Sequence, residues 1–156
     1  MTNHPRLVVI PTQGFANRMR MVACGYVLAK LLDMKYAVIW EASHECNIGF
    51  GDVFSDYPFD LLQMQNVTDT KYLYFGHIHT ESVIDRIENS LNDYDTIILT
   101  GGHEFKHPTM TTKEFVSQKQ KCYKSLVFHD KIRENVETLN LPDRYASIHV
   151  RNVIAK

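Results

Sequence analysis

Residues 7–20 read Leu-Val-Val-Ile-Pro-Thr-Gln-Gly-Phe-Ala-Asn-Arg-Met-Arg, and this stretch decides the fold. Its first four residues are apolar and mostly β-branched, as in a buried strand, and Pro11 to Gly14 then supply turn-forming residues. Over residues 17–32, apolar side chains recur at spacings of three and four, which predicts a helix. A strand, a turn and a helix therefore follow one another directly.

A second strand is predicted at 36–40, where Tyr-Ala-Val-Ile-Trp is apolar and aromatic. With the preceding elements it forms a βαβ unit, for which parallel pairing and a right-handed crossover are the rule. Residues 41–65 are predicted to form a loop with one short helix at 59–64. Further strands are predicted at 71–75, 96–100 and 146–150, and further helices at 81–91, 112–123 and 129–139. This alternation predicts an α/β fold with an open, mostly parallel sheet flanked by helices.

The composition is that of one folded domain. A chain of 156 residues can build one hydrophobic core, and no stretch is apolar enough and long enough to span a membrane. The net charge of -1 argues against nucleic acid or acidic membranes as partners. The irregular spacing of Cys24, Cys46 and Cys122 and the absence of a signal-peptide pattern predict free thiols in a cytoplasmic protein.

The turn after the first strand is a candidate anion site. A helix that starts at the carboxyl end of a strand directs backbone N–H groups and the positive end of its dipole toward whatever lies above it. Gly14 permits close backbone approach, Asn17 can cap the helix or donate its amide, and Arg18 with Arg20 adds positive charge. The alternative is that Asn17 only caps the helix and that the arginines are solvated. The single glycine falls short of a dinucleotide-binding fingerprint.

The predicted last strand carries a second candidate site. Because side chains alternate along a strand, His149 and Arg151 share one face, at the carboxyl end of a strand where open α/β sheets bind ligands. An arginine fork suits phosphate oxygens, and a histidine can donate a hydrogen bond beside it. The alternative is a surface histidine and arginine without a binding role.

Three segments together resemble the fucosyltransferase superfamily, which contains alpha-1,6-, alpha-1,2- and protein O-fucosyltransferases. Gln-Gly-Phe-Ala-Asn-Arg-Met-Arg at 13–20 resembles the family's Gly-Gly-x-Gly-Asn-Arg/Gln loop. Trp40, Cys46 and the Phe-Gly-Asp-Val-Phe at 50–54 resemble a Trp, Cys, Phe-x-Asp-x-Phe series that follows its second strand. Residues 123–126 and 141–151, ending in His-Val-Arg, resemble the approach to its His-x-Arg-Arg-x-Asp motif.

The resemblance implies a two-domain, GT-B-like transferase that moves fucose from GDP-fucose to a glycan or another hydroxyl acceptor, with inversion and without a metal or a further cofactor. Residues 1–145 would form the N-terminal open-sheet domain, and 146–156 the first strand of a C-terminal nucleotide-sugar domain. Arg151 would contact the donor diphosphate with His149 beside it, while Gly14, Phe15, Asn17 and Arg18 would close over the donor. No catalytic residue is assigned.

On this interpretation the chain is truncated and is weakly active or inactive alone. The alternative function is a non-catalytic binding or interaction domain that keeps the fold. The sequence also departs from the family pattern, because the loop around Gly14-Phe15-Ala16 lacks two of the expected glycines and Asn152-Val153-Ile154 stands where Arg-x-Asp is expected.

One motif points to different chemistry. His-Glu-Phe-Lys-His at 103–107 matches the zincin pattern His-Glu-x-x-His, which needs both histidines on one face of a helix. Gly101 and Gly102 precede it and Pro108 follows it, and these residues disfavour a helix there. The sequence therefore predicts no metal site.

Overall fold

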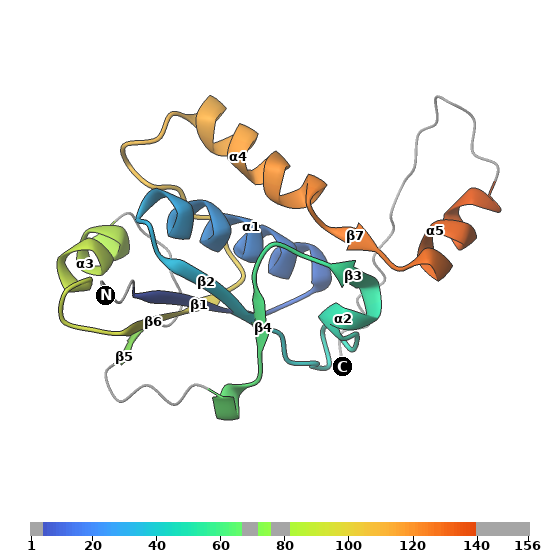
Figure 1. Cartoon of the computed structure of the whole chain (residues 1–156), viewed down its shortest axis with the longest axis horizontal. Coiled ribbons are helices and arrows are strands. Elements are labelled where there is room, and N and C mark those ends of the chain that lie inside the picture. The colour runs from blue at the N-terminus through green and yellow to red at the C-terminus, as the bar shows by residue number, and fades with distance from the viewer. Residues whose placement is uncertain (1–4, 67–71, 76–81, 140–156) are drawn as a thin grey trace, which may run out of the picture.

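The computed structural model describes residues 5–66, 72–75 and 82–139 (Figure 1). In chain order the elements are β1 (Arg6–Pro11), α1 (Phe15–Leu31), β2 (Lys35–Ile39), α2 (Phe50–Val53), β3 (Phe54–Asp56), β4 (Asp60–Leu62), the 3-10 helix η1 (Met64–Asn66), β5 (Tyr72–Phe75), α3 (Ser82–Ser90), β6 (Thr96–Gly101), α4 (Thr112–Lys124), β7 (Val127–Phe128) and α5 (Asp130–Glu137).

The main sheet has five strands in the order β4-β2-β1-β6-β5, and each neighbouring pair is parallel. The predicted open parallel sheet is therefore confirmed. From β1 the chain moves outward to β2 and then β4, and it later returns on the other side of β1 through β5 and β6. β1 is thus the central strand, and open α/β sheets bind ligands outside the carboxyl ends of their strands.

Helices α1 and α3 cover the same face of this sheet, with α4 packed outside α1 (Figure 1). The β1-α1-β2 and β5-α3-β6 units advance in the same direction across the sheet, so right-handed crossovers place both helices on one face. Apolar side chains of the sheet, the three helices and neighbouring loops form the main core: Leu7, Val9, Met21, Cys24, Val27, Leu28, Ala29, Met34, Ile84, Ile87, Ile97, Leu99, Phe105 and Phe115.

Helix α1 lies very close to the sheet at Gly25. A Cβ atom at this position would lie 2.5 Å from Cγ2 of Val9 and 2.7 Å from the hydroxyl oxygen of Tyr36. The Tyr36 hydroxyl donates a 2.7 Å hydrogen bond to the carbonyl of Val22, one turn earlier in α1. Only glycine permits this approach, which fixes the position of α1 over β1 and β2.

The structure corrects the prediction for residues 41–65. The short helix is α2, at Phe50–Val53, and residues 60–62 form β4, which pairs with β2 through Ala37, Val38 and Ile39. Three residues are too few to show a hydrophobic period, so only the pairing reveals this strand. A second, two-stranded antiparallel sheet joins β3 to β7 and lies beside α5 (Figure 1).

The other predicted elements within the described ranges are confirmed to within a few residues. The predicted strand at 146–150 lies outside the described residues. In the described part of the chain, no helix combines the length and the apolar character that crossing a membrane requires.

Candidate functional site at the carboxyl edge of the sheet

The loop after β1 lies at the carboxyl edge of the sheet, beside the end of β6. Strand β1 ends at Pro11 beside Gly101, the last residue of β6, and the amide of Thr12 donates a 2.8 Å hydrogen bond to the Gly101 carbonyl. Helix α1 then begins at Phe15 with Gly14 as its N-cap residue, and its first turn contains no acidic residue. The positive end of the helix dipole and the carboxyl ends of the central strands therefore meet at the predicted anion site.

Gln13 organises this loop. Its φ angle is 70°, in the left-handed region that non-glycine residues rarely adopt, and such conformations cluster at functional sites. Its side-chain oxygen accepts a 2.6 Å hydrogen bond from Asn17, and its backbone carbonyl accepts one of 2.7 Å from Nε of Arg18. The Gln13 side chain also lies against Gly102, where a Cβ atom would come within 2.6 Å of it. The loop is thus held by α1 on one side and by the end of β6 on the other.

Gly14 and Phe15 form the open surface of the site. Gly14 has an ordinary extended backbone, with φ at -69°, and a Cβ added there would meet no atom within 4 Å. The packing of the chain itself therefore does not require a glycine at this position. Phe15 is 37% exposed, and its ring meets Trp40 edge-on at 5.7 Å between centroids. These two residues lie at the surface, as a ligand contact requires.

Arg18 is buried, so the alternative that it is merely solvated is wrong. Its side chain is only 3% exposed, and each of its nitrogen atoms donates a hydrogen bond: Nε to the Gln13 carbonyl, Nη1 to the Glu41 carbonyl and Nη2 to the Ser43 hydroxyl at 2.8 Å. Arg18 thus connects the loop after β1 to the loop after β2. The helix cap is Gly14 rather than Asn17, so the capping alternative for Asn17 is also wrong.

The loop after β2 forms a compact turn beside Arg18. Ser43 and Cys46 exchange backbone hydrogen bonds of 3.0 and 3.1 Å, and the buried Cys46 side chain anchors the turn. A pocket of about 190 Å³ opens between the two loops. Its lining residues are Ile10, Pro11, Thr12, Gln13, Arg18, Glu41, Ala42, Ser43, His44 and Glu45. Residues 41–45 were not among the predicted site residues, although their position directly after a parallel strand next to the centre of the sheet was the signal that could have identified them.

Two of the segments that carried the family resemblance meet here. Trp40 contacts Arg18 and Phe15 from the first segment, and its ring packs on Phe50 from the second at 5.1 Å between centroids. The Trp40 indole nitrogen donates a 2.8 Å hydrogen bond to the Ile48 carbonyl, which holds the loop that leads into α2. Residues separated by more than twenty positions thus form one continuous cluster.

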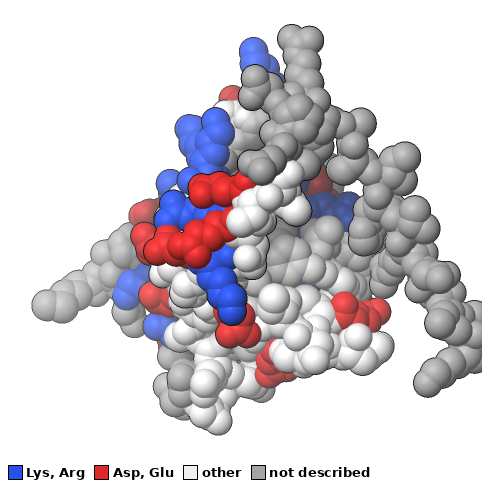
Figure 2. Space-filling view, turned by 90° about the vertical axis from the view of Figure 1, so that its right-hand side faces the viewer, with Lys and Arg blue, Asp and Glu red and all other residues white. Residues whose placement is uncertain are grey.

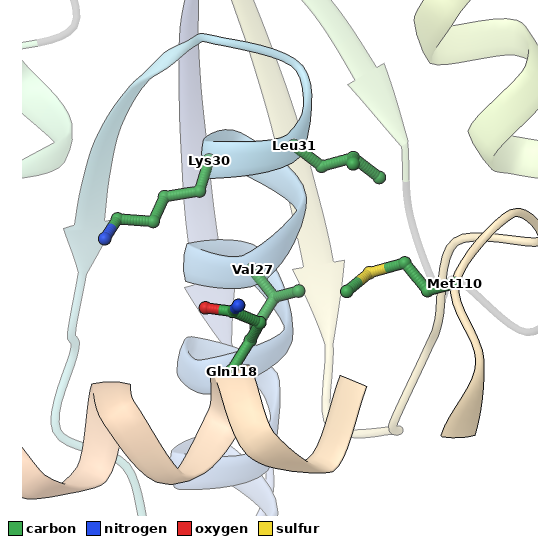
Figure 3. A pocket seen from close by; sticks show the side chains of 5 residues that line it. All are labelled: Val27, Lys30, Leu31, Met110 and Gln118. Atoms are coloured by element: carbon green, nitrogen blue, oxygen red, sulfur yellow. The ribbon is translucent and has the colours of Figure 1, made fainter. Parts of the chain in front are cut away.

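A larger pocket, of about 260 Å³, lies between α1 and α4 (Figure 3). It is lined by Val27, Lys30, Leu31, Met110 and Gln118. Figure 3 shows that the Lys30 side chain extends away from Leu31 and Met110, and its ammonium group lies over the Tyr26 ring, 4.9 Å from the centroid. Because polar groups do not converge on this pocket and it lies beside the C-terminal half of α1, the loops at the other end of α1 are the better candidate site.

The His-Glu-x-x-His segment is not helical, as predicted. His107 is buried, and its ring lies 2.9 Å from Oε1 of Glu88 and 2.7 Å from the Thr109 hydroxyl. His107 therefore connects α3 to the loop before α4, a structural role that the sequence did not reveal. Among the described residues there is no group of three His, Cys, Asp or Glu side chains that could hold a metal ion.

The remaining predicted site residues, His149 and Arg151, lie outside the described residues. The three cysteines are free and buried, as the irregular spacing predicted. On the face that Figure 2 presents, Lys and Arg side chains are interspersed with Asp and Glu side chains and form no continuous basic surface. The described part of this face thus lacks the electrostatic footprint of a nucleic-acid-binding protein.

No protein-family model matches the sequence, and no characterised protein matches it significantly in sequence. The fold does match solved structures. A point mutant of Arabidopsis thaliana FUT1 in complex with GDP is 14% identical, with a TM-score of 0.56 over 87% of this chain and 40% of that one. The fucosyltransferase NodZ from Bradyrhizobium is 12% identical, with a TM-score of 0.54 over 87% of this chain and 55% of that one.

A NodZ alpha-1,6-fucosyltransferase soaked with GDP-fucose gives a TM-score of 0.53 at 12% identity, again over 87% of this chain and 55% of that one. The chain thus spans about half the length of these enzymes. Over the part that matches, the chain has a fucosyltransferase-like fold.

Proposed function

We propose that this chain forms the N-terminal half of a GT-B-type glycosyltransferase that transfers fucose from GDP-fucose to a glycan or another hydroxyl acceptor. The observation that carries the proposal is the position of the Gln13–Asn17 hydrogen-bonded turn and the start of α1 at the carboxyl end of the central strand of a fucosyltransferase-like fold. Of the matched structures, the FUT1 mutant was solved in complex with GDP and one NodZ crystal was soaked with GDP-fucose, which supports a nucleotide sugar as the ligand.

In this proposal Gly14, Phe15 and Asn17 form the N-terminal wall of the donor site. His149 and Arg151 lie at the start of the C-terminal half, with Arg151 on the diphosphate and His149 beside it. GT-B-like chemistry orients the donor between two walls, and orientation can lower a barrier by several kcal/mol. The free cysteines support a reducing compartment, so we place the protein in the cytoplasm.

GDP binding by the 156-residue chain, measured by calorimetry, tests the donor wall. A Gly14→Ala variant should stay folded, because the added Cβ atom meets no atom within 4 Å, but it should bind GDP more weakly if the ligand approaches the backbone there. Gly51→Ala is the matched control, since a Cβ atom at Gly51, in α2, also meets no atom within 4 Å. Equal GDP affinity in all three proteins would remove Gly14 from the site.

Transfer itself is tested with radiolabelled GDP-fucose and a panel of glycan acceptors, on this chain and on a version extended by any downstream coding sequence. We expect activity in the extended protein and little or none in the short chain. Equal turnover by both would contradict the two-domain proposal. GDP binding without transfer by the extended protein would instead favour the non-catalytic alternative.

Arg151 has its own test. Arg151→Lys replaces a planar fork with a point charge and should weaken GDP binding in the extended protein by about 1–3 kcal/mol. An unchanged affinity would exclude Arg151 as the diphosphate ligand.

A further inference from the structure

The pocket between the loops after β1 and β2 is chemically unlike a diphosphate site. Glu41 and Glu45 are among its lining residues, while Arg18, the single arginine or lysine among them, is buried and already donates to three oxygen atoms. Phosphate oxygens only accept hydrogen bonds, so two carboxylates would repel them. The pocket thus disfavours binding of the diphosphate of a nucleotide sugar.

The same groups suit a ligand rich in hydroxyl groups. Carboxylates accept hydrogen bonds from hydroxyl donors, and Thr12 and Ser43 contribute hydroxyls that can donate or accept. The side chains of Glu41, His44 and Glu45 are exposed, and they make no hydrogen bond or ion pair in the described part of the chain. A volume of about 190 Å³ is below the roughly 300–1,000 Å³ of pockets for drug-sized ligands, which favours a single small ring.

We propose that this pocket binds a neutral pyranose ring of the hydroxyl acceptor. The proposal rests on the function proposed above, because it places an acceptor sugar next to the donor at the start of α1. Gln13 belongs to both sites: it lines the pocket, and its side chain holds Asn17 at the donor wall. An acceptor in the pocket therefore lies beside Gln13, the residue directly before Gly14.

Arg18 is the positioning residue of this pocket rather than a donor ligand. Its bonds to Glu41 and Ser43 join residues that are 23 and 25 positions away in sequence, and its guanidinium rests on the Trp40 ring at 5.2 Å. The Ser43 hydroxyl accepts the hydrogen bond from Nη2 of Arg18 and a second one, of 3.3 Å, from the backbone amide of Glu45. Arg18 thus sets the shape of the turn that presents His44 and Glu45.

Amide chemical shifts of the isotope-labelled 156-residue chain test the proposal. The probes are methyl galactopyranoside, methyl N-acetylglucosaminide and, separately, GDP, with each sugar raised to about 100 mM to detect millimolar affinity. We expect a methyl pyranoside to shift the amides of residues 41–46, and GDP to shift those of Gly14, Phe15 and Asn17. If neither sugar shifts residues 41–46, or if GDP shifts them as its main effect, the acceptor pocket is wrong.

The two proposals fail separately in this experiment. If GDP shifts no amide, the donor wall is wrong, whatever the sugars do; if GDP behaves as expected and the sugars do not, only the acceptor pocket is wrong. Glu45→Gln removes a charged hydrogen-bond acceptor and should weaken sugar binding about tenfold without changing GDP binding. Glu137→Gln, on the exposed surface of α5, is the matched control and should change neither.

Ser43→Ala tests the positioning role without disturbing the buried Arg18 core. It removes the hydroxyl that joins Arg18 to the turn, so it should reduce sugar affinity and speed amide hydrogen exchange at residues 43–46, while GDP binding stays unchanged. Unchanged sugar affinity and exchange in Ser43→Ala would show that Arg18 does not position this pocket.

Discussion

The guanidinium of Arg18 lies over the indole ring of Trp40, 5.2 Å from its centroid, and this contact joins the first helix to the end of the second strand. Arg18 comes four residues after the N-cap Gly14, and Trp40 directly follows β2. Both residues are therefore placed by elements that the parallel sheet brings to one edge. A buried guanidinium that stacks and donates at the same time is a role that lysine cannot reproduce.

Arg18→Lys should destabilise the fold. Lysine cannot reach the carbonyls of Gln13 and Glu41 and the Ser43 hydroxyl together, so buried acceptors lose their donors. We expect the free energy of unfolding to fall by about 2–4 kcal/mol in urea denaturation. Arg20→Lys is the control, because Arg20 is exposed and, among the described residues, hydrogen-bonds only to Asn17; it should leave the midpoint unchanged. Equal midpoints for both variants would refute the structural role of Arg18.

Gly25→Ala should destabilise the contact between α1 and the sheet. Alanine favours a helix interior by roughly 1 kcal/mol over glycine, but its methyl group would clash with Val9 and Tyr36 at 2.5 and 2.7 Å. Overpacking of this kind costs about 1–3 kcal/mol, so the net effect should be a lower thermal midpoint. Gly51→Ala has open space and should be neutral or slightly stabilising. A Gly25→Ala protein more stable than wild type would show that α1 is free to shift.

Stability should decrease at alkaline pH because of two buried thiols. Burial raises the pKa of Cys24 from 9.0 to about 11 and that of Cys122 to about 12. The unfolded chain releases these protons near pH 9.0 while the folded chain keeps them, so the unfolded state binds fewer protons there. The free energy of unfolding should be unaffected by these thiols below that pH and then fall by up to about 1.4 kcal/mol per pH unit for each thiol.

Urea denaturation at a series of pH values between the ordinary and the folded pKa values checks this prediction. In Cys24→Ala the slope between pH 9 and 10 should be smaller than that of wild type, because one thiol no longer contributes. Burial also raises the pKa values of Tyr36 and Tyr123, so these two groups add to the slope in both proteins. A slope of zero in the wild-type chain would mean that solvent reaches both thiols in the folded state.

His107→Ala should weaken the attachment of α3. The substitution leaves Glu88 and Thr109 without their shared partner, and we expect a loss of about 1–3 kcal/mol in unfolding free energy. His44→Ala, at an exposed histidine, should leave stability unchanged. Metal analysis should find no stoichiometric zinc in the purified chain. Zinc that is lost on His103→Ala would restore the zincin interpretation.

The sequence alone determined the elements whose periodicity is long enough to be recognised. The buried run in β1, the helical spacing of α1 and the alternation of strands with helices follow from local patterns, and they predict the open parallel sheet. The loop after β1 was also identified from sequence, because any loop between a strand and a helix in such a sheet faces a ligand-binding edge.

Tertiary structure decided what depends on residues far apart in the chain. Strand β4 is too short to carry a pattern and exists through its pairing with β2. From the sequence, Arg18 was a candidate anion ligand or else a solvated charge, and it is buried because Trp40, Glu41 and Ser43 are brought to it by the parallel register of β1 and β2. His107 likewise contacts Glu88, 19 positions away in sequence, because the fold brings α3 beside the loop before α4. Local periodicity reports which face of an element is apolar, whereas hydrogen-bond partners across the sheet are fixed only when the strands align.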